Sequence, residues 1–291
     1  MFQAKQTRRD QSRSRQLSVL KNGLIDVQTI KNELPWAIVN NELNVHYQPQ
    51  FNIEDHSTRH LEALVRWNHP KFGFISPAAF VPVAEELGLV EEITHFVIRE
   101  VIQDISSWRN CSVPVDKVAV NISAVLLSSP DNAERLYNLL KTNVAFAPLL
   151  VLELTETATV QNTDLARQYM QKFRDLGFRI ALDDFGTGSS SLAYLLDFPV
   201  DIIKIDRCFV SALPHSEKGR AITNSIVSLA KSLGLQVIAE GIEHADELRI
   251  LMELGCTLIQ GFYFSRPLPA AEVRDFLLCN RKRDSWPLWL A

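Results

Sequence analysis

The sequence predicts an α/β protein built as a modified TIM (β/α)8 barrel, and three observations point to that class. Eight short apolar runs of strand length alternate with segments of helix length over most of the 291 residues. Most of these runs are apolar throughout, as strands of a parallel sheet are when both faces are covered. Only a short polar stretch around Asp55 separates the first two runs, and a parallel pair needs a crossover of about a dozen residues or more. The first strand is therefore expected to run antiparallel to the others.

The expected chain begins with a helix and a hairpin. Apolar residues recur every four positions over Gln28–Asn41, which predicts a helix, although Pro35 interrupts the run. Strands Leu43–Pro49 and Leu61–Trp67 follow, and we expect them to form an antiparallel hairpin that turns near position 55.

The rest of the chain alternates strands with helices. Helices Pro77–Leu87 and Val90–Trp108 follow the hairpin, and Ser76 before Pro77 fits an N-cap followed by proline at the first helical position. The remaining predicted strands are Val118–Asn121, Leu149–Glu153, Phe178–Asp183, Ile202–Ile205, Val237–Glu240 and Leu258–Gly261. The remaining predicted helices are Ala133–Lys141, Thr163–Leu176, Ser190–Leu196, Gly219–Leu233, Ala245–Leu254 and Ala270–Leu278.

Bulk composition describes a globular protein without a nucleic-acid or membrane signature. The formal net charge is −4, so we expect no DNA partner. No apolar run reaches the length of a membrane span, and the chain does not start with a signal peptide. The four cysteines form no Cys-x-x-Cys pair, which argues against zinc and favours free thiols in a reducing cytoplasm.

Three segments are expected from the charge pattern. Residues 1–25 are a basic segment, of the kind that is usually solvated or disordered. Residues 26–280 form the barrel domain, and residues 281–291 form a tail that is basic and then aromatic. Such a tail could touch a membrane or a partner, but it packs more often on its own domain.

Polar side chains end the predicted strands at one end of the barrel. In this fold, catalytic residues lie at the carboxyl ends of the strands. Because an unpaired buried carboxylate is costly, a polar residue at seven strand ends indicates a site better than it indicates packing. The residues are Glu62, Asn121, Glu153, Asp183, Lys204, Glu240 and Gln260, and Gln48 lies opposite Glu62 in the hairpin.

The charge balance of these residues predicts bound cations. Only Lys204 and Arg66 oppose the carboxylates, and such an excess of negative charge takes up either protons or cations. All the candidate ligand atoms are oxygens, including the amide carbonyl of Asn121, which favours Mg²⁺ or Mn²⁺ over zinc. Asp183 could bridge two ions roughly 3.5–4 Å apart, the usual arrangement for cleaving phosphoesters. Five carboxylates enter this charge balance, namely those of Glu62, Glu153, Asp183, Asp184 and Glu240.

Each of these residues has more than one possible role. Lys204 could orient a water molecule or neutralise charge in the transition state. Glu240 could accept the proton of that water, or hold the second ion through water. The pair Asp183–Asp184 could instead form a turn that caps the next helix.

Two residues near the strand ends also have two interpretations. Arg66 has the guanidinium geometry for bidentate phosphate binding, or it forms a salt bridge at the rim of the barrel. Glu156 could support the loop Gly186–Gly188 by hydrogen bonding, or it is an ordinary acidic residue at a helix N-terminus.

Motifs over residues 34–278 resemble those of the EAL family of cyclic di-GMP phosphodiesterases. The segment Glu62–Trp67 reads EALVRW and carries the signature that names the family. The other matching motifs are Tyr47–Pro49, Asn121–Ser123, Glu153–Glu156, Asp183–Gly188, Lys204–Asp206, Ala239–Glu243 and Gln260–Gly261. Ser189 departs from the pattern, since many relatives carry an aromatic residue there.

The resemblance implies a role for each matched residue. It implies that Mg²⁺ or Mn²⁺ is held by Glu62, Asn121, Glu153 and Asp183, with Asp184 serving a second ion. Lys204 and Glu240 are implied as the pair that activates water. Substrate contacts are implied for Gln48, Leu64, Arg66, Asp206 and Gln260. Support of the loop after Asp184 is implied for Glu156, Gly186, Thr187, Gly188 and Glu243.

The function implied by the resemblance is hydrolysis of cyclic di-GMP to linear 5'-pGpG by two-metal activation of water, which lowers the level of a bacterial second messenger. The alternatives are a catalytically silent cyclic di-GMP receptor and an unrelated metal-dependent barrel that cleaves another phosphodiester. The family also implies a homodimer coupled to activity through the loop after Asp184. Residues Met1–Arg9 are similar to the closing helix of GGDEF domains, which suggests an upstream GGDEF or sensory domain in a longer protein. We expect a cytoplasmic location, either free or as part of a membrane-tethered protein.

Overall fold

The structure, a computed structural model, describes residues 17–20, 23–155, 163–187 and 195–279. The described residues form two compact units. The first contains the chain up to Val45 together with Val65–Val97, and the second contains His46–Leu64 together with the chain from Ile98 onward. Strands β3 (Leu43–Asn52) and β4 (Ser57–His69) run through both units.

The first unit begins with a two-stranded hairpin and a helix. Strand β1 (Leu17–Leu20) pairs antiparallel with β2 (Gly23–Asp26). Helix α2 (Val27–Val39) starts at Asp26, whose Oδ1 accepts a hydrogen bond from Thr29 N at 2.6 Å. This side chain satisfies one of the N–H groups that a helix start leaves unpaired. Helix α2 continues through Pro35 to Val39.

The other elements of the first unit surround a buried tryptophan. Trp67 is fully buried and packs edge-on against Phe80 of helix α3 (Pro77–Leu87). Its indole Nε1 donates to Glu42 Oε2 at 3.0 Å, so the polar atom of this large side chain has a partner. Gly88 ends α3 at φ +73°, a backbone conformation that glycine adopts at low cost. Strand β5 (Gly73–Ile75) pairs antiparallel with the end of β4.

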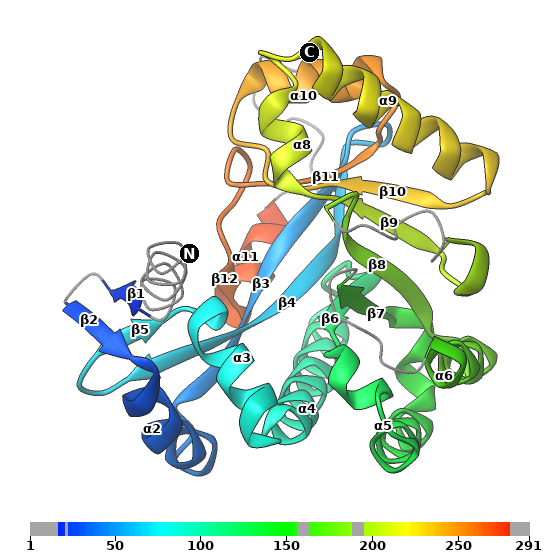
Figure 1. The fold of residues 1–291 in the computed structure, drawn as a ribbon. Coiled ribbons are helices and arrows are strands. Elements are labelled where there is room, and N and C mark those ends of the chain that lie inside the picture. Colours follow the sequence, from blue (N-terminus) through cyan, green and yellow to red (C-terminus); the bar gives the residue numbers. More distant parts are fainter. Residues whose placement is uncertain (1–16, 21–22, 156–162, 188–194, 280–291) are drawn as a thin grey trace, which may run out of the picture. The chain divides into compact units, whose positions relative to one another are not determined.

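The second unit is a closed ring of eight strands (Figure 1). The ring runs in the order β3, β11, β10, β9, β8, β7, β6, β4, and the pairing of β4 with β3 closes it. Neighbouring strands from β4 to β11 are parallel, whereas β3 pairs antiparallel with β11. This confirms the predicted modified (β/α)8 barrel with its first strand reversed. The other strands are β6 (Lys117–Asn121), β7 (Leu150–Thr155), β8 (Arg179–Phe185), β9 (Ile202–Ile205), β10 (Gln236–Ala239) and β11 (Leu258–Gln260).

Helices connect the strands of the ring, and Figure 1 shows α5, α6 and α9 outside it. The helices after α3 are α4 (Val90–Asn110), α5 (Pro130–Thr142), α6 (Thr163–Asp175), α8 (Arg207–Ala212), α9 (Glu217–Ser232), α10 (Ala245–Glu253) and α11 (Ala270–Cys279). The short elements are the 3₁₀ turns η1 (Ala124–Leu127) and η2 (Val144–Leu149) and the strand β12 (Leu268–Pro269). None of the helices in the described part of the chain is long and apolar enough to cross a membrane.

An apolar layer inside the ring determines where the polar strand ends point. Six buried side chains from consecutive strands form one cluster. The side chains of this cluster point into the ring. Because side chains two residues apart in a strand lie on the same face, the residue two positions after each cluster residue also points inward. Those later residues are Asn121, Glu153, Asp183, Lys204, Glu240 and Gln260. The cluster residues below them are Ala119, Val151, Ala181, Ile202, Ile238 and Leu258.

Several details differ from the predicted elements. Strand β3 extends past Pro49 to Asn52 and β4 begins at Ser57, because the hairpin turn occupies only residues 53–56. Five short elements were not predicted from the sequence, namely β1, β2, β5, β12 and α8. Most of the predicted helix Ser190–Leu196 lies outside the described residues.

Candidate active site

The ammonium group of Lys204 lies among four carboxylates at the carboxyl end of the strands. Its Nζ atom is 2.7 Å from Glu240 Oε1, 2.9 Å from Glu153 Oε2, 3.3 Å from Asp183 Oδ1 and 3.6 Å from Glu62 Oε2. Lys204 itself is fully buried. The structure thus brings together charged residues from strands β4, β7, β8 and β9 and from the end of β10.

Amide side chains hold the carboxylate of Glu62 from both sides. Gln260 Nε2 donates to Glu62 Oε2 at 2.5 Å and to Gln48 Oε1 at 3.2 Å. Asn121 Nδ2 donates to Glu62 Oε1 at 3.0 Å, so the carbonyl oxygen of Asn121 is not used by this bond. Gln50 Nε2 donates to Gln260 Oε1 at 2.9 Å. Each oxygen of the Glu62 carboxylate therefore accepts an amide hydrogen.

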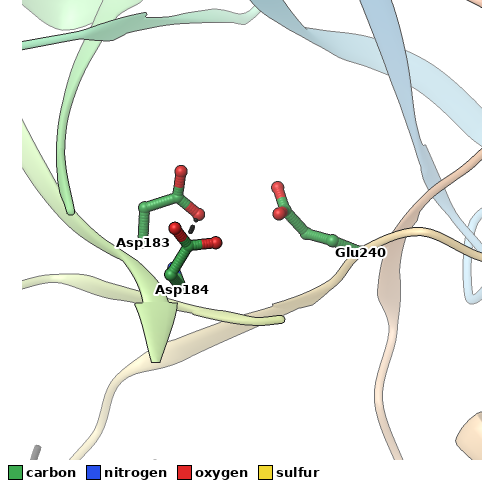
Figure 2. Close-up of side chains that lie close together, drawn as sticks. All are labelled: Asp183, Asp184 and Glu240. Atoms are coloured by element: carbon green, nitrogen blue, oxygen red, sulfur yellow. Dashed lines mark hydrogen bonds between the residues drawn. The ribbon is translucent and has the colours of Figure 1, made fainter. Parts of the chain in front are cut away.

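An irregularity in β8 presents two neighbouring aspartates to one place. The pairing of β8 with β9 shifts register between Leu182 and Phe185, and Asp184 takes a left-handed backbone conformation with φ +54°. Such a bulge redirects side chains that a regular strand would point to opposite faces. Asp184 N also donates to Asp183 Oδ1 at 2.9 Å. Figure 2 shows Asp183 and Asp184 with Glu240 opposite them, and ligand oxygens of these three residues lie within 4.8 Å of one another.

Burial and charge act on the protonation of these groups in opposite directions. Burial alone would lower the pKa of Lys204, but Glu153, Glu240, Glu62 and Asp183 together raise it well above its usual value. Burial would raise the pKa of Glu62, but Lys204 and the amide donors of Gln260 and Asn121 hold it below its usual value. These contacts favour the charged form of Lys204 and the ionised form of Glu62.

Three more carboxyl groups of the site have raised pKa values. Burial raises the pKa of Glu153 well above its usual value despite Lys204, because Glu62, Asp183 and Glu240 add negative charge. Burial also raises the pKa of Glu240 to about 8, although Lys204 opposes this shift. Burial, followed by the charge of Asp183, raises the pKa of Asp184 to about 6. The site therefore holds more carboxyl groups than its own cation can keep ionised.

The donor set fits a hard divalent cation. Four carboxylates face one ammonium, and Asp184 adds a fifth carboxyl group beside Asp183. Glu153 Oε1 is buried and has no hydrogen-bond partner among the described residues, which is costly unless another group uses it. The cluster offers carboxylate and amide oxygens, the ligands that Mg²⁺ and Mn²⁺ prefer.

The predicted substrate-contact residues lie in different surroundings. Leu64 is half-buried in β4, close in sequence to Glu62. Asp206 caps helix α8, where its Oδ1 accepts from Cys208 N at 2.9 Å, and its negative charge contributes to the raised pKa of Asp184. Arg66 belongs to the first unit, where its guanidinium lies 5.9 Å from the ring centre of Phe74.

The first residues of the loop after Asp184 pack closely on helix α8. Gly186 has φ +95°, and a Cβ atom at this position would lie 2.8 Å from the ring of Phe209. Thr187 Oγ1 donates to the carbonyl oxygen of Asp184 at 2.8 Å. Glu243 forms an ion pair with Arg207 at 3.0 Å. The predicted loop residues Glu156 and Gly188 lie outside the described residues, as does Ser189.

One residue of the site, Gln50, was not predicted from the sequence. A signal for it existed, because Gln50 is two residues from Gln48 and must share its face of the strand. Gly261 was named as part of a motif but without a role, and the structure supplies one, since a Cβ atom there would lie 2.1 Å from the carbonyl oxygen of Ile242. Only glycine allows the backbone after Gln260 to approach the chain after Glu240 so closely.

The fold and the site together describe a modified (β/α)8 barrel with an acidic candidate active site at the carboxyl ends of its strands. A family model described as "EAL domain" matches residues 31–267. The chain therefore belongs to the EAL domain family.

Individual relatives carry informative names. The chain is 41% identical over 235 residues to "Cyclic di-GMP phosphodiesterase PdeR" of Escherichia coli. The aligned region covers 80% of this chain and 35% of the relative. It is 37% identical over 259 residues to "Cyclic di-GMP phosphodiesterase NbdA" of Pseudomonas aeruginosa, which covers 89% of this chain and 33% of the relative. The chain thus spans about a third of the length of these curated relatives.

A solved structure also resembles the chain closely. The structure described as "PaMucR Phosphodiesterase, c-di-GMP complex" has a TM-score of 0.78 and 34% sequence identity. The similarity covers 84% of this chain and 99% of that one, so the likeness extends over the whole of the solved domain.

Proposed function

We propose that this chain is a metal-dependent phosphodiesterase that hydrolyses cyclic di-GMP to linear 5'-pGpG, and so lowers the level of this second messenger in bacterial signalling. The observation that carries the proposal is the convergence of five carboxyl groups and Lys204 at the barrel end of an EAL domain. The names of PdeR and NbdA support the choice of substrate.

Two Mg²⁺ or Mn²⁺ ions would be held by the oxygen ligands of the site. When bound, such ions supply Lewis-acid activation of water and neutralise charge on the phosphate. Glu62 is suited to this task because two amide donors fix its carboxylate. Asp183 and Asp184 are suited because the bulge in β8 directs both to Glu240. The proposed ligands are Glu62, Asn121, Glu153, Asp183 and Asp184.

Lys204 and Glu240 are the proposed catalytic pair for the attacking water. Lys204 is buried, and the surrounding carboxylates favour its charged form, so it can orient the water and offset negative charge that develops at the phosphate. Glu240 lies 2.7 Å from Lys204 and has a raised pKa of about 8, which places its proton affinity in the range of a general base. A cation beside Asp183 would lower this pKa and favour the form that accepts a proton.

The proposed substrate contacts are amide, apolar and guanidinium groups. Gln48 and Gln260 lie next to Glu62 in the site, and Asp206 lies next to Asp184. Leu64 and Arg66 follow Glu62 in β4, and a guanidinium group such as that of Arg66 suits bidentate phosphate binding. Glu156, Gly186, Thr187, Gly188 and Glu243 are proposed to support the loop after Asp184.

A hydrolysis assay tests this proposal. The purified chain with Mn²⁺ should convert cyclic di-GMP to pGpG, as followed by chromatography, and excess EDTA should stop the conversion. Glu253→Ala is a matched control, because it removes an exposed glutamate at the end of α10, outside the site, that pairs with Arg249. Tight binding of cyclic di-GMP without any conversion would contradict the enzyme and favour a receptor. Equal cleavage of unrelated phosphodiesters would contradict the substrate.

The surroundings of the domain are also proposals. We infer that residues 26–280 form the catalytic domain, with a basic segment before it and a tail after it. A homodimer, an upstream GGDEF or sensory domain and a cytoplasmic location are the expected context. Light scattering of the purified chain, with and without cyclic di-GMP and Mn²⁺, tests the dimer, and a monomer under all conditions would contradict it.

A further inference from the structure

Gln50 is one hydrogen bond removed from the candidate ligand Glu62, and it bonds to no carboxylate in the part of the chain that the structure describes. It is 3% exposed, and its Nε2 atom donates to Gln260 Oε1 at 2.9 Å. None of the matched motifs includes this position, and none of the proposed roles uses it. Among the described residues, its side chain donates to the Gln260 amide, which also contacts Glu62.

The side-chain amides of Gln48, Gln50 and Gln260 form a hydrogen-bond network in which each donor meets an acceptor. Gln48 Nε2 donates to the carbonyl oxygen of Ser265 at 3.2 Å, so Gln48 turns its own oxygen to Gln260. The two hydrogens of Gln260 Nε2 then serve Gln48 Oε1 and Glu62 Oε2. The remaining polar atom, Gln260 Oε1, accepts from Gln50.

Reversing the Gln260 amide would break all three of its hydrogen bonds. Its oxygen would face the oxygens of Glu62 and Gln48, and its NH₂ group would face the NH₂ group of Gln50. An amide has nearly the same shape in both orientations, so the partners decide which one is occupied. Gln50 is the partner that fixes the oxygen end.

We propose that Gln50 is a positioning residue: it sets the orientation of the Gln260 amide, and Gln260 in turn holds the Glu62 carboxylate ready for a divalent cation. This inference rests on the proposed function, because it concerns the same site. The inference can be tested by measuring cation binding, with no need for substrate turnover.

The test compares two substitutions of similar shape. Gln50→Glu places an acceptor against Gln260 Oε1 and so favours the reversed amide, whereas Gln50→Met removes the donor without adding an acceptor. Outer residues around metal sites typically change metal affinity by about 10–100-fold. We therefore expect Gln50→Glu to weaken Mn²⁺ binding by about tenfold or more, and Gln50→Met to weaken it less. The readout is a Mn²⁺ titration by calorimetry, with thermal unfolding of each variant as the control for folding.

A double-mutant cycle separates positioning from a simple packing role. If Gln50 acts through Gln260, Gln50→Glu should cause little further loss of Mn²⁺ affinity in a Gln260→Ala background. Additive losses, or equal Mn²⁺ affinity in the wild-type chain and Gln50→Glu, would overturn the inference. A wild-type chain that binds Mn²⁺ in a Gln50-dependent way but does not cleave cyclic di-GMP would overturn the proposed function alone.

Discussion

The two ends of the barrel strands carry polar groups of different kinds. At the carboxyl ends, carboxylates from several strands crowd one lysine, and a buried oxygen of Glu153 has no partner among the described residues. At the amino ends, Arg179 donates to Gln236 Oε1 at 2.9 Å and to the carbonyl oxygen of Asp201 at 3.4 Å, and Lys117 donates to the carbonyl oxygen of Pro148.

This contrast separates function from stability within the same strands. The amino-end groups have partners that the fold supplies, and Asp201 accepts hydrogen bonds from Ile180 N and Arg174, each at 2.9 Å. At the carboxyl end, one lysine cannot keep all of the carboxyl groups ionised, and the pKa values of three of them are raised. In (β/α)8 barrels, the carboxyl end holds the chemistry and the opposite end serves stability. Substitutions at the two ends should therefore have different effects.

The largest expected effect is that of Glu62→Ala. This substitution removes a proposed cation ligand that both Gln260 and Asn121 contact. Turnover of cyclic di-GMP should fall by more than the roughly 100-fold that loss of an outer residue can cost. Initial rates at saturating Mn²⁺ measure the loss. Activity close to wild type would contradict the assignment of catalysis to the carboxyl ends of the strands.

Glu240→Gln should come next. It keeps the shape of the side chain but removes the proposed general base, whose contribution is typically about 10²–10⁴-fold in rate. We expect the loss in kcat, with a smaller change in KM. A pH–rate profile of the variant should lose the limb that reports the base. A changed KM with unchanged kcat would instead indicate that Glu240 acts in binding.

Lys204→Met should affect stability as well as turnover. It leaves four carboxylates facing one another without their ammonium, and breaking a buried ion pair costs about 3–5 kcal/mol. Chemical denaturation without metal should show this loss, and Mn²⁺ should restore part of it by supplying positive charge. A variant as stable as the wild type without metal would show that these carboxylates are already protonated.

Arg179→Met probes the other end and should have the smallest effect. It leaves Gln236 Oε1 and the Asp201 carbonyl oxygen without this donor, which costs on the order of 1 kcal/mol. The free energy of unfolding should fall by about that amount, while turnover of the folded protein stays unchanged. A loss of turnover as large as that of Glu240→Gln would abolish the distinction between the two ends.

The sequence predicted the ring of strands and the grouping of strand-end residues, because both follow from periodicity. Parallel strands end at one edge, so Glu153, Asp183 and Lys204 must meet if the strands are assigned correctly. The short apolar runs and the brief polar turn near Asp55 were sufficient for that assignment.

The remaining features depend on contacts between distant residues. Asp184 lies in a bulge whose register is determined by β9, and nothing in its neighbours specifies φ +54°. The orientation of the Gln260 amide depends on Gln50, which is 210 residues away. Helix α8 has only six residues and too short a pattern to be recognised, although Asp206 before it is an ordinary N-cap.

The close approach at Gly261 has a consequence for how variation in this chain should be interpreted. A side chain there would collide with the backbone of Ile242, and backbone atoms cannot rotate out of the way as a flexible side chain can. In a saturation-mutagenesis library, position 261 should therefore tolerate almost no substitution, as if it took part in the reaction. The intolerance of position 261 would come from the steric clash alone. A screen that scores only survival would misinterpret it as evidence that Gly261 takes part in catalysis.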